Sequence, residues 1–333
     1  MKQTPSTAAP HRRRWLAAAL AATGALALAG PAVAQANYPD RPIRLLVGYS
    51  AGGGIDAVAR LYQPRLSQLL GQQVVVENRA GAAGLIAGDL VAKAAPDGYT
   101  LLLGDSSTLI AQHLQPKMSF DPLKSFAPVA GLVTAPLVIV TGADFPARTP
   151  AEFISRVKAE PGKYSFATSG VGQVQHLGFE LFKARTQTQV VHVPYKGAAQ
   201  IVPDVMSGQV PIGVVSATAA IAQLKSGRLK AIAVMSPVKL AGAEEVPALA
   251  DVLPGFDAAP RLFIAAPAGT PPAIVSRLSD AVRQVMNAPD FTAAALAQGS
   301  VPAYLPSAEL AQDLVRESAM WGKVVKDQKI TVE

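Results

Sequence analysis

Two stretches of this chain follow the same order of strand, glycine-containing loop, helix and strand, and this repetition is the strongest constraint on its fold. Residues 43–49 form an apolar run typical of a buried strand, and a glycine-rich loop then leads into a helical pattern that continues to Leu70. In the second stretch, a strand at 164–167 and a loop at 168–172 precede a helix at 174–185. Units of this length favour parallel pairing with right-handed crossovers. The pattern predicts an α/β protein with two lobes, each a central sheet flanked by helices.

The same pattern predicts further details of the fold. Asp56 follows the first glycine-rich loop and is predicted to be the N-cap of its helix. Residues 132–141 are predicted to form one strand. The final amphipathic helix, at 307–326, is expected to pack back on the first lobe, so the chain would cross between lobes near 141–149 and 257–262. The expected organisation is lobe 1 at 37–142 plus 259–333, and lobe 2 at 143–258.

Residues 1–36 have the composition of a cleavable export signal. A positive block of three arginines precedes an apolar run at 15–29, which is shorter than the ~20 residues of a membrane-spanning helix. Small-residue triplets at 32–34 and 34–36 fit signal cleavage, so the mature chain is predicted to begin at Gln35 or Asn37. An N-terminal membrane anchor is the alternative. The expected compartment is the periplasm, and the Sec and twin-arginine routes both stay open.

Composition argues against several function classes. The net charge of +7 falls to +3 without residues 1–36, because these hold four basic and no acidic residues. No basic run remains, so nucleic acid is not an expected partner. The sequence contains no cysteine, which excludes disulfides and thiolate metal sites. No later apolar stretch approaches 18 residues, so the mature protein is expected to be soluble.

Loops at the carboxyl ends of the predicted strands are the expected binding site, as in other open α/β sheets. They are rich in Gly, Ser, Thr and Asn, and main-chain N–H groups at the helix starts favour an anion. For each glycine loop the alternative is a tight turn that binds nothing. Loops from both lobes could hold the two ends of a short acid. The residues expected to bind the ligand are Ser50, Ala51, Gly52, Gly53, Asp56, Ser106, Ser107, Ser169, Gly170, Gln173, His176, Lys196, Gly197, Ser216 and Thr218.

Cofactor and metal sites are not expected. Gly52-Gly53-Gly54 lacks the spacing of dinucleotide-binding and phosphate-binding loops. His192 lies within a predicted strand and is interpreted as structural. His176 follows the second glycine loop, where ligand contact and plain packing are equally consistent with the pattern. No histidine spacing typical of a metal site occurs.

An esterase is the enzymatic alternative, because Gly48-Tyr49-Ser50-Ala51-Gly52 matches the nucleophile elbow G-x-S-x-G. In hydrolases that serine follows several strands, with an oxyanion loop before it and the acid and histidine after it. Here Ser50 follows the first mature strand, and the last histidine is His192. We therefore predict that the chain is not an enzyme and that Ser50 belongs to the ligand loop.

Five segments resemble the tripartite tricarboxylate transporter receptors, also called Bug proteins. The segments are YPDRPIRLLVGYSAGGGIDAVAR (38–60), VVVENRAGAAGLIAGDLVAKAAPDGYTLLLG (74–104), SFDPLKSFAPV (119–129), VVHVPYKGAAQ (190–200) and APAGTPPAIVSRL (266–278). They occur in the family's order across the mature chain. The resemblance implies a Venus-flytrap fold of the type II-like periplasmic-binding-protein class, a small carboxylate ligand and delivery to a separate membrane permease. A receptor that feeds a sensor is the remaining alternative, and a monomer is expected.

The resemblance also carries expectations about the site. It implies that the loop at 52–56 holds a ligand carboxyl partly through ordered waters. Many members carry an acidic residue near Ser216, which this chain lacks. An acid there would pair with a ligand amino group, so its absence favours dicarboxylates, tricarboxylates or aromatic acids over amino acids. Arg261 stands where many members have Trp; a cation in the cleft and a position on the surface are equal alternatives for it.

Overall fold

The computed structural model describes residues 38–115, 117–195, 200–224 and 226–331. Arg41–Glu333 form one compact unit. The predicted export signal and the predicted site residues Lys196 and Gly197 lie outside the described residues. No helix in the described ranges is both long enough and apolar enough to cross a membrane.

The first sheet has six strands, namely β1 (Ile43–Val47), β2 (Val74–Asn78), β3 (Thr100–Asp105), β4 (Phe126–Thr134), β10 (Arg261–Pro267) and β11 (Val301–Pro306). Their order is β11-β4-β10-β3-β1-β2. β1 pairs in parallel with β2 and β3, as predicted, whereas β10 runs antiparallel to both β3 and β4. The carboxyl ends of β1 to β4 therefore lie at the same edge as the amino ends of β10 and β11.

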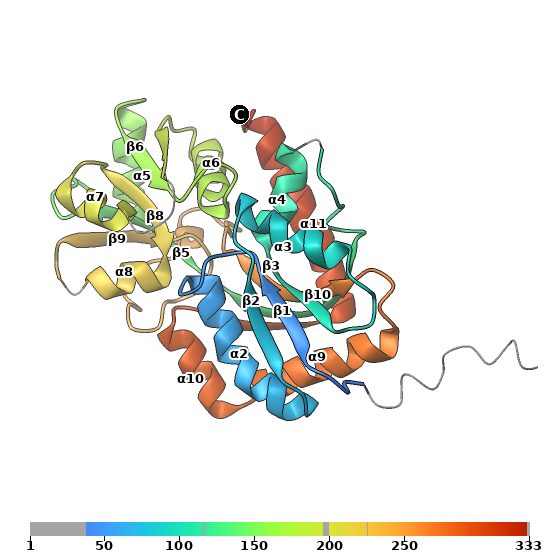
Figure 1. Cartoon of the computed structure of the whole chain (residues 1–333). Helices are drawn as coiled ribbons and strands as arrows, with labels where there is room; N and C mark the ends of the chain where they lie inside the picture. Colours follow the sequence, from blue (N-terminus) through green and yellow to red (C-terminus); the bar gives the residue numbers. More distant parts are fainter. Residues whose placement is uncertain (1–37, 116, 196–199, 225, 332–333) are drawn as a thin grey trace, which may run out of the picture. The chain divides into compact units, whose positions relative to one another are not determined.

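The second sheet has five strands, namely β5 (Leu137–Gly142), β6 (Ser165–Thr168), β7 (Val191–Pro194), β8 (Ile212–Ser216) and β9 (Leu229–Val234). Their order is β7-β6-β8-β5-β9, with β6 parallel to β7 and β8 and with β5 antiparallel to β8 and β9. The two sheets confirm the predicted fold class, because each is a mixed sheet flanked by helices (Figure 1).

The helices are α2 (Gly54–Leu70), η1 (Ala82–Gly84), α3 (Leu85–Ala92), α4 (Ser106–Leu114), α5 (Pro150–Ala159), α6 (Val174–Thr186), α7 (Ile201–Ser207), α8 (Ala217–Leu224), η3 (Leu249–Asp251), α9 (Pro272–Met286), α10 (Pro289–Ala297) and α11 (Ser307–Asp327). Side chains of a strand alternate between the two faces of its sheet. Leu46 and Leu102 accordingly pack with α3, α4 and α11, and their neighbours Leu45 and Leu101 face α2 and α9.

Both faces of the second sheet are covered in the same way. Ile139 and Phe166 belong to a cluster that includes α5 and α6, whereas Val138 and Ala167 pack with α7 and α8. All four side chains are fully buried. Apolar residues therefore follow one another along these strands, as expected for sheets buried on both faces.

The C-terminal helix α11 packs on both lobes rather than on the first alone. Leu310 and Leu314 lie in the apolar cluster of the first sheet, together with residues of α3 and α4. Trp321, Val324 and Val325 lie in the cluster of the second sheet, and α11 also contacts α6. The prediction that this helix packs on the first lobe therefore describes only its amino-terminal half.

Three other details of the prediction are wrong. The strand predicted at 132–141 is broken at Ala135 and Pro136, so that β4 and β5 belong to different sheets. The chain therefore crosses between sheets before residue 137, and the predicted lobe boundary after residue 142 lies too late. Helix α2 begins at Gly54 with Gly53 as its N-cap, so Asp56 is not the N-cap. The pattern also did not predict α10 and β11.

Candidate functional site

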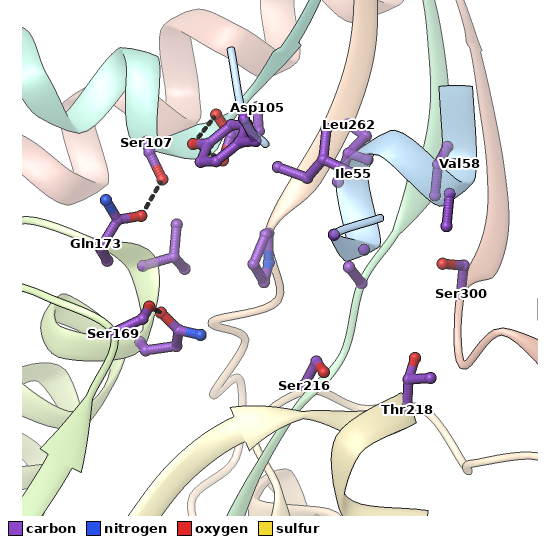
Figure 2. A pocket seen from close by; sticks show the side chains of 18 of the residues that line it. Ile55, Val58, Asp105, Ser107, Ser169, Gln173, Ser216, Thr218, Leu262 and Ser300 are labelled. Atoms are coloured by element: carbon purple, nitrogen blue, oxygen red, sulfur yellow. Dashed lines mark hydrogen bonds between the residues drawn. The ribbon is translucent and has the colours of Figure 1, made fainter. Parts of the chain in front are cut away.

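A cavity of about 740 Å³ lies where the loop-bearing edges of the two sheets face each other (Figure 2). Its lining comes from both lobes and from the first crossing, at Ala135 and Pro136. Four helices begin at its wall: α2, α4, α6 and α8. The apolar part of the lining consists mainly of Ile55, Val58, Leu137, Val174 and Leu262. The cavity is thus surrounded by the edges of both sheets, by the starts of four helices and by an apolar wall.

The loop from β1 to α2 approaches a neighbouring loop so closely that only glycine fits. A Cβ atom on Gly48 would lie 2.4 Å from the Cα of Gly84, which is far inside contact distance. Further along the same loop, Gly52 has φ +80°, a conformation that side chains disfavour. Both glycines line the cavity, and Ser50 lies exposed between them. The glycines therefore shape this wall.

Asp56 stabilises this loop through hydrogen bonds and does not line the cavity. Its carboxylate accepts hydrogen bonds from the N–H of Gly52 at 2.8 Å, from Arg60 at 2.8 Å and from Asn78 at 2.9 Å. Burial alone would raise the pKa of Asp56, but these hydrogen bonds outweigh it and lower the pKa to about 2. Asp56 is therefore a charged residue that holds the loop in place from outside the cavity lining.

The junction where β3 ends and α4 begins brings an acid to the wall. Asp105 is 4% exposed, and the hydroxyl of Tyr49 lies 3.0 Å from each of its carboxylate oxygens. Burial raises the pKa of Asp105 to about 6, although hydrogen bonds from Tyr49 and Ser107 oppose the shift. The hydroxyl of Ser107 reaches across the cavity and donates to Gln173 Oε1 at 3.3 Å (Figure 2).

Ser106, the first residue of α4, is fully buried away from the cavity. Its hydroxyl donates to Glu317 of α11 and accepts from the N–H of Arg261 at 2.9 Å. Arg261 itself pairs with Asp257, which precedes β10, and with Asp313 of α11. The predicted contacts of Ser106 with a ligand, and of Arg261 as a cleft cation, are therefore not supported, because neither residue lines the cavity.

Glu317 makes this buried cluster sensitive to pH. Burial raises its pKa to about 7, above an ordinary value of 4.5, and the Ser106 hydrogen bond and the charge of Arg261 only partly oppose this. The contribution of Glu317 to the stability of the folded protein therefore falls as pH rises from about 4.5 through about 7. Glu317→Gln removes the charge and keeps an oxygen for Ser106 and Trp321. We expect the variant to be more stable than the parent at pH 8 by on the order of 1 kcal/mol, and nearly equal at pH 5. Urea unfolding at both values measures this.

Glu309→Gln is the matched control, since Glu309 is exposed on the same helix and its loss should not change the pH dependence. A Glu317→Gln variant that is less stable than the parent at pH 8 would show that the ion pair with Arg261 outweighs the cost of burial.

In the second lobe, the loop from β6 to α6 places Ser169, Gln173 and Gln175 on the cavity wall. The hydroxyl of Ser169 donates to Gln175 Oε1. Gly170 and Gly172 have φ of +143° and +79°, which lets this loop turn sharply into the helix.

His176 lies behind this loop and packs rather than lining the cavity. Its Nδ1 accepts a hydrogen bond from the N–H of Gly172 at 3.3 Å, and its ring stacks on His192 with centroids 3.9 Å apart. The pKa of His176 is lowered to about 3 by burial and by the neighbouring His192 and Lys183. Burial likewise lowers the pKa of His192 to about 4. Both rings are therefore neutral at neutral pH and support the loop.

The junction where β8 ends and α8 begins closes the opposite side of the cavity. Ser216 accepts a hydrogen bond from the N–H of Ala219 at 3.3 Å. Thr218 donates to the carbonyl of Gln298, which belongs to the first lobe. A Cβ atom on Gly299 would lie 2.7 Å from Thr218 Oγ1, so these two loops are also in close contact. The Ser107–Gln173 and Thr218–Gln298 contacts therefore join the lobes on either side of the cavity.

The structure divides the predicted site residues into three groups. Those that line the cavity are Ser50, Gly52, Gly53, Ser107, Ser169, Gln173, Ser216 and Thr218. Those that do not line it are Ala51, Asp56, Ser106, Gly170 and His176, and Lys196 and Gly197 lie outside the described residues. Lining residues that the prediction missed include Tyr49, Asp105, Pro136, Leu262 and Gln298–Ser300. Contact with a ligand stays a prediction for all of them.

The chemistry of the wall favours an anion held by neutral groups. No lysine or arginine lines the cavity among the described residues. The starts of α2, α6 and α8 offer main-chain N–H groups and partial positive charge, and serine and threonine hydroxyls lie beside them. Within the same described ranges, no cluster of three or more His, Cys, Asp or Glu residues could hold a metal ion.

Comparisons with known proteins agree with this architecture. The profile of the family described as "Tripartite tricarboxylate transporter family receptor" matches residues 58–330. Protein BugT of Bordetella pertussis is 35% identical over 303 residues, which cover 90% of this chain and 93% of BugT.

Two solved structures are 30% identical: R. palustris Rpa4515 with adipate, and MatC (Rpa3494) from Rhodopseudomonas palustris with bound malate. The first has a TM-score of 0.79 and covers 88% of this chain and 99% of that one. The second has a TM-score of 0.74 and covers 86% and 100%. The chain therefore belongs to the tripartite tricarboxylate transporter receptors, a family of periplasmic solute-binding proteins that includes the Bug proteins.

Proposed function

We propose that this receptor captures a small dicarboxylate in the cavity and delivers it to the membrane permease of a tripartite tricarboxylate-type transporter. The observation that carries the proposal is the convergence of helix starts from both lobes on a cavity without a lysine or arginine among its described lining residues. Such an arrangement binds carboxylates through N–H groups and hydroxyls at both ends. The apolar side chains between the ends suit a short methylene chain.

Two relatives support the class of ligand. The structure of Rpa4515 contains adipate and that of MatC contains malate, and both molecules are dicarboxylates. A cavity of about 740 Å³ is large enough for an acid of that size together with ordered water. The proposal also includes export by the Sec or twin-arginine route, removal of residues 1–36, and action as a monomer.

Closure of the two lobes is part of the same proposal. The lobes would be residues 41–134 with 261–331, and residues 137–234 with the segment that follows them, so that the chain crosses at Ala135–Pro136 and again before β10. A ligand that contacts both lobes favours the closed arrangement by its differential contacts.

A thermal-shift screen of residues 37–333 tests the proposal. The protein is first unfolded and refolded to remove any bound ligand, and is then screened with acetate, malate, adipate, citrate and benzoate. A ligand at 100 times its dissociation constant adds about 2.7 kcal/mol, so we expect malate or adipate to raise the midpoint by several degrees.

The matched control is adipamide, which keeps the length of adipate but carries no charge. Equal shifts with adipate and adipamide would contradict an anion site. No shift with any acid at millimolar concentration would contradict the proposed ligand class.

A further inference from the structure

The two lobes contact each other at both ends of the cavity, but the two contacts differ in kind. In Figure 2, Ser107 and Gln173 lie at one end of the cavity, and Thr218 and Ser300 lie at the other. The first end is formed by the starts of α4 and α6, and α11 contacts both of these helices. The second end is formed by the start of α8 and by the segment between α10 and β11. The packing at each end indicates which of them can open.

At the end formed by α4, α6 and α11, the lobes share one apolar core. Ile110 of α4 and Trp321 of α11 stand on helices of the first lobe, yet both lie in the apolar cluster of the second sheet, together with Phe166 and Phe179. All four side chains are fully buried. Separation of the lobes here would expose these side chains to water, which is unfavourable in proportion to the apolar area exposed. We therefore expect this end to stay packed.

At the other end, the lobes meet through main-chain atoms and one hydroxyl group. Thr218 donates to the carbonyl of Gln298, and a Cβ atom on Gly299 would lie 2.7 Å from Thr218 Oγ1 and 2.8 Å from its nitrogen. Among the described residues, the apolar cluster beside α8 contains second-lobe residues alone, so it does not extend across this contact. Water can replace such a hydrogen bond with little change in free energy. This end can therefore separate without exposing that cluster.

We propose that the cavity opens and closes at the contact of Thr218 with Gln298 and Gly299, while the packing of α4 and α11 on the second sheet acts as a fixed pivot. Two chain crossings alone would leave both ends of the cavity free to open, so the pivot determines the direction of opening. The ligand then enters between the start of α8 and the segment after α10. Gly299, which has no side chain, lets the lobes close fully. The inference rests on the lobe closure that belongs to the proposed function.

Gly299→Ala tests the closing contact. The three atoms nearest to its added methyl group all belong to Thr218, on the other lobe, so the group meets them only when the lobes are closed. We expect malate or adipate to bind at least about tenfold more weakly than to the parent, as for overpacking of a close contact. Small-angle scattering should show that the radius of gyration falls less on binding than it does in the parent.

Gly71→Ala is the matched control for backbone strain. Gly71 has φ +70°, against +68° for Gly299, and a Cβ atom there would meet nothing within 4 Å. The strain of alanine in this conformation is present in open and closed lobes alike, so it cancels in binding. Gly71→Ala should therefore bind as the parent does, and both variants should unfold at similar urea concentrations without ligand.

Thr218→Val keeps the test decisive if Gly299→Ala does not fold. Valine keeps the shape of the threonine side chain but removes the hydrogen bond to Gln298. Binding of malate or adipate should weaken about threefold or more, which is the size of one neutral hydrogen bond.

Trp321 reports on the pivot without any substitution. It is the one tryptophan in the sequence of residues 37–333, because the other is Trp15. Its fluorescence should be protected from acrylamide to the same extent in the refolded ligand-free protein and with malate or adipate, since its packing does not change when the cavity opens.

The outcomes separate the two proposals. If neither acid binds to the parent, the proposed ligand class fails, and protection or quenching of Trp321 in the ligand-free protein supports or contradicts the pivot by itself. If an acid binds, and Gly299→Ala binds and compacts as the parent does, the lobes do not close at this contact. If Trp321 becomes accessible to acrylamide when the ligand is removed, the lobes separate at α11 and the inference is wrong.

Discussion

Trp321→Ala is expected to lower the free energy of unfolding by about 3–5 kcal/mol, the usual cost of emptying a large buried site. Trp321 is fully buried, and its indole N–H donates to Glu317 at 3.2 Å. Its ring belongs to the cluster of the second sheet although it stands on the C-terminal helix. The substitution would therefore leave a cavity and also remove one donor to the buried carboxylate. Urea unfolding followed by circular dichroism measures the change.

Val315→Ala is the control for that experiment. Val315 lies on the same helix with 55% of its surface exposed, and its truncation should change stability by less than about 0.5 kcal/mol. A Trp321→Ala variant as stable as Val315→Ala would mean that the C-terminal end of α11 does not pack against the second sheet in solution.

Gly48→Ala is expected to destabilise the protein by about 1–3 kcal/mol and to weaken ligand binding at least tenfold. The added methyl group would meet the Cα, C and O atoms of Gly84 at 2.4 to 3.1 Å, and main-chain atoms cannot rotate away as a side chain can. The loops that carry Gly48 and Ala83 both line the cavity, so forcing them apart would change its wall. Urea unfolding and titration with adipate or malate measure the two effects.

Gly54→Ala provides the comparison. Gly54 also lines the cavity, but a Cβ atom there would meet nothing within 4 Å. Because Gly54 is the first residue of α2, alanine should leave stability unchanged or raise it by up to about 1 kcal/mol. Equal stability of the two variants would contradict a close approach at Gly48.

The alternation of strands and helices was predictable because local patterns determine it. Apart from the run at 132–141, each apolar run predicted to be a strand contains one, and Gly71 ends α2 with φ +70°, as its position after the last apolar residue predicts. The lobe boundary was not predictable in the same way. An uninterrupted apolar run across Ala135 and Pro136 looks like one strand, although Pro136 was the available signal for a break. Likewise, the apolar stripe of α11 does not indicate that the two halves of this helix pack in the apolar clusters of different sheets.

The candidate site could be predicted by loop but not by residue. Strand ends indicate which loops meet, because the carboxyl ends of parallel strands share one edge. They do not indicate that Ser107 faces the cavity while Ser106, its neighbour, is buried against Glu317. That distinction depends on how α4 sits against α11. Gln298–Ser300 carry no pattern at all, and they reach the cavity only through the packing of α10 and β11 on the first lobe.

The insertion of β10 between β3 and β4 has a consequence for how the protein is made. A chain that emerges from its N-terminus can pair β1 with β2 and β3 early, but β3 and β4 stay as open edges until residue 267 is available. The last strand of the second sheet ends at Val234, but the apolar cluster of that sheet also includes Trp321, which is made later. The first sheet, which begins first along the chain, is thus the last to receive all of its strands. For most of the synthesis, neither lobe has all the segments that its apolar core requires. Both sheets therefore lack part of their final packing until the C-terminal helix has been made.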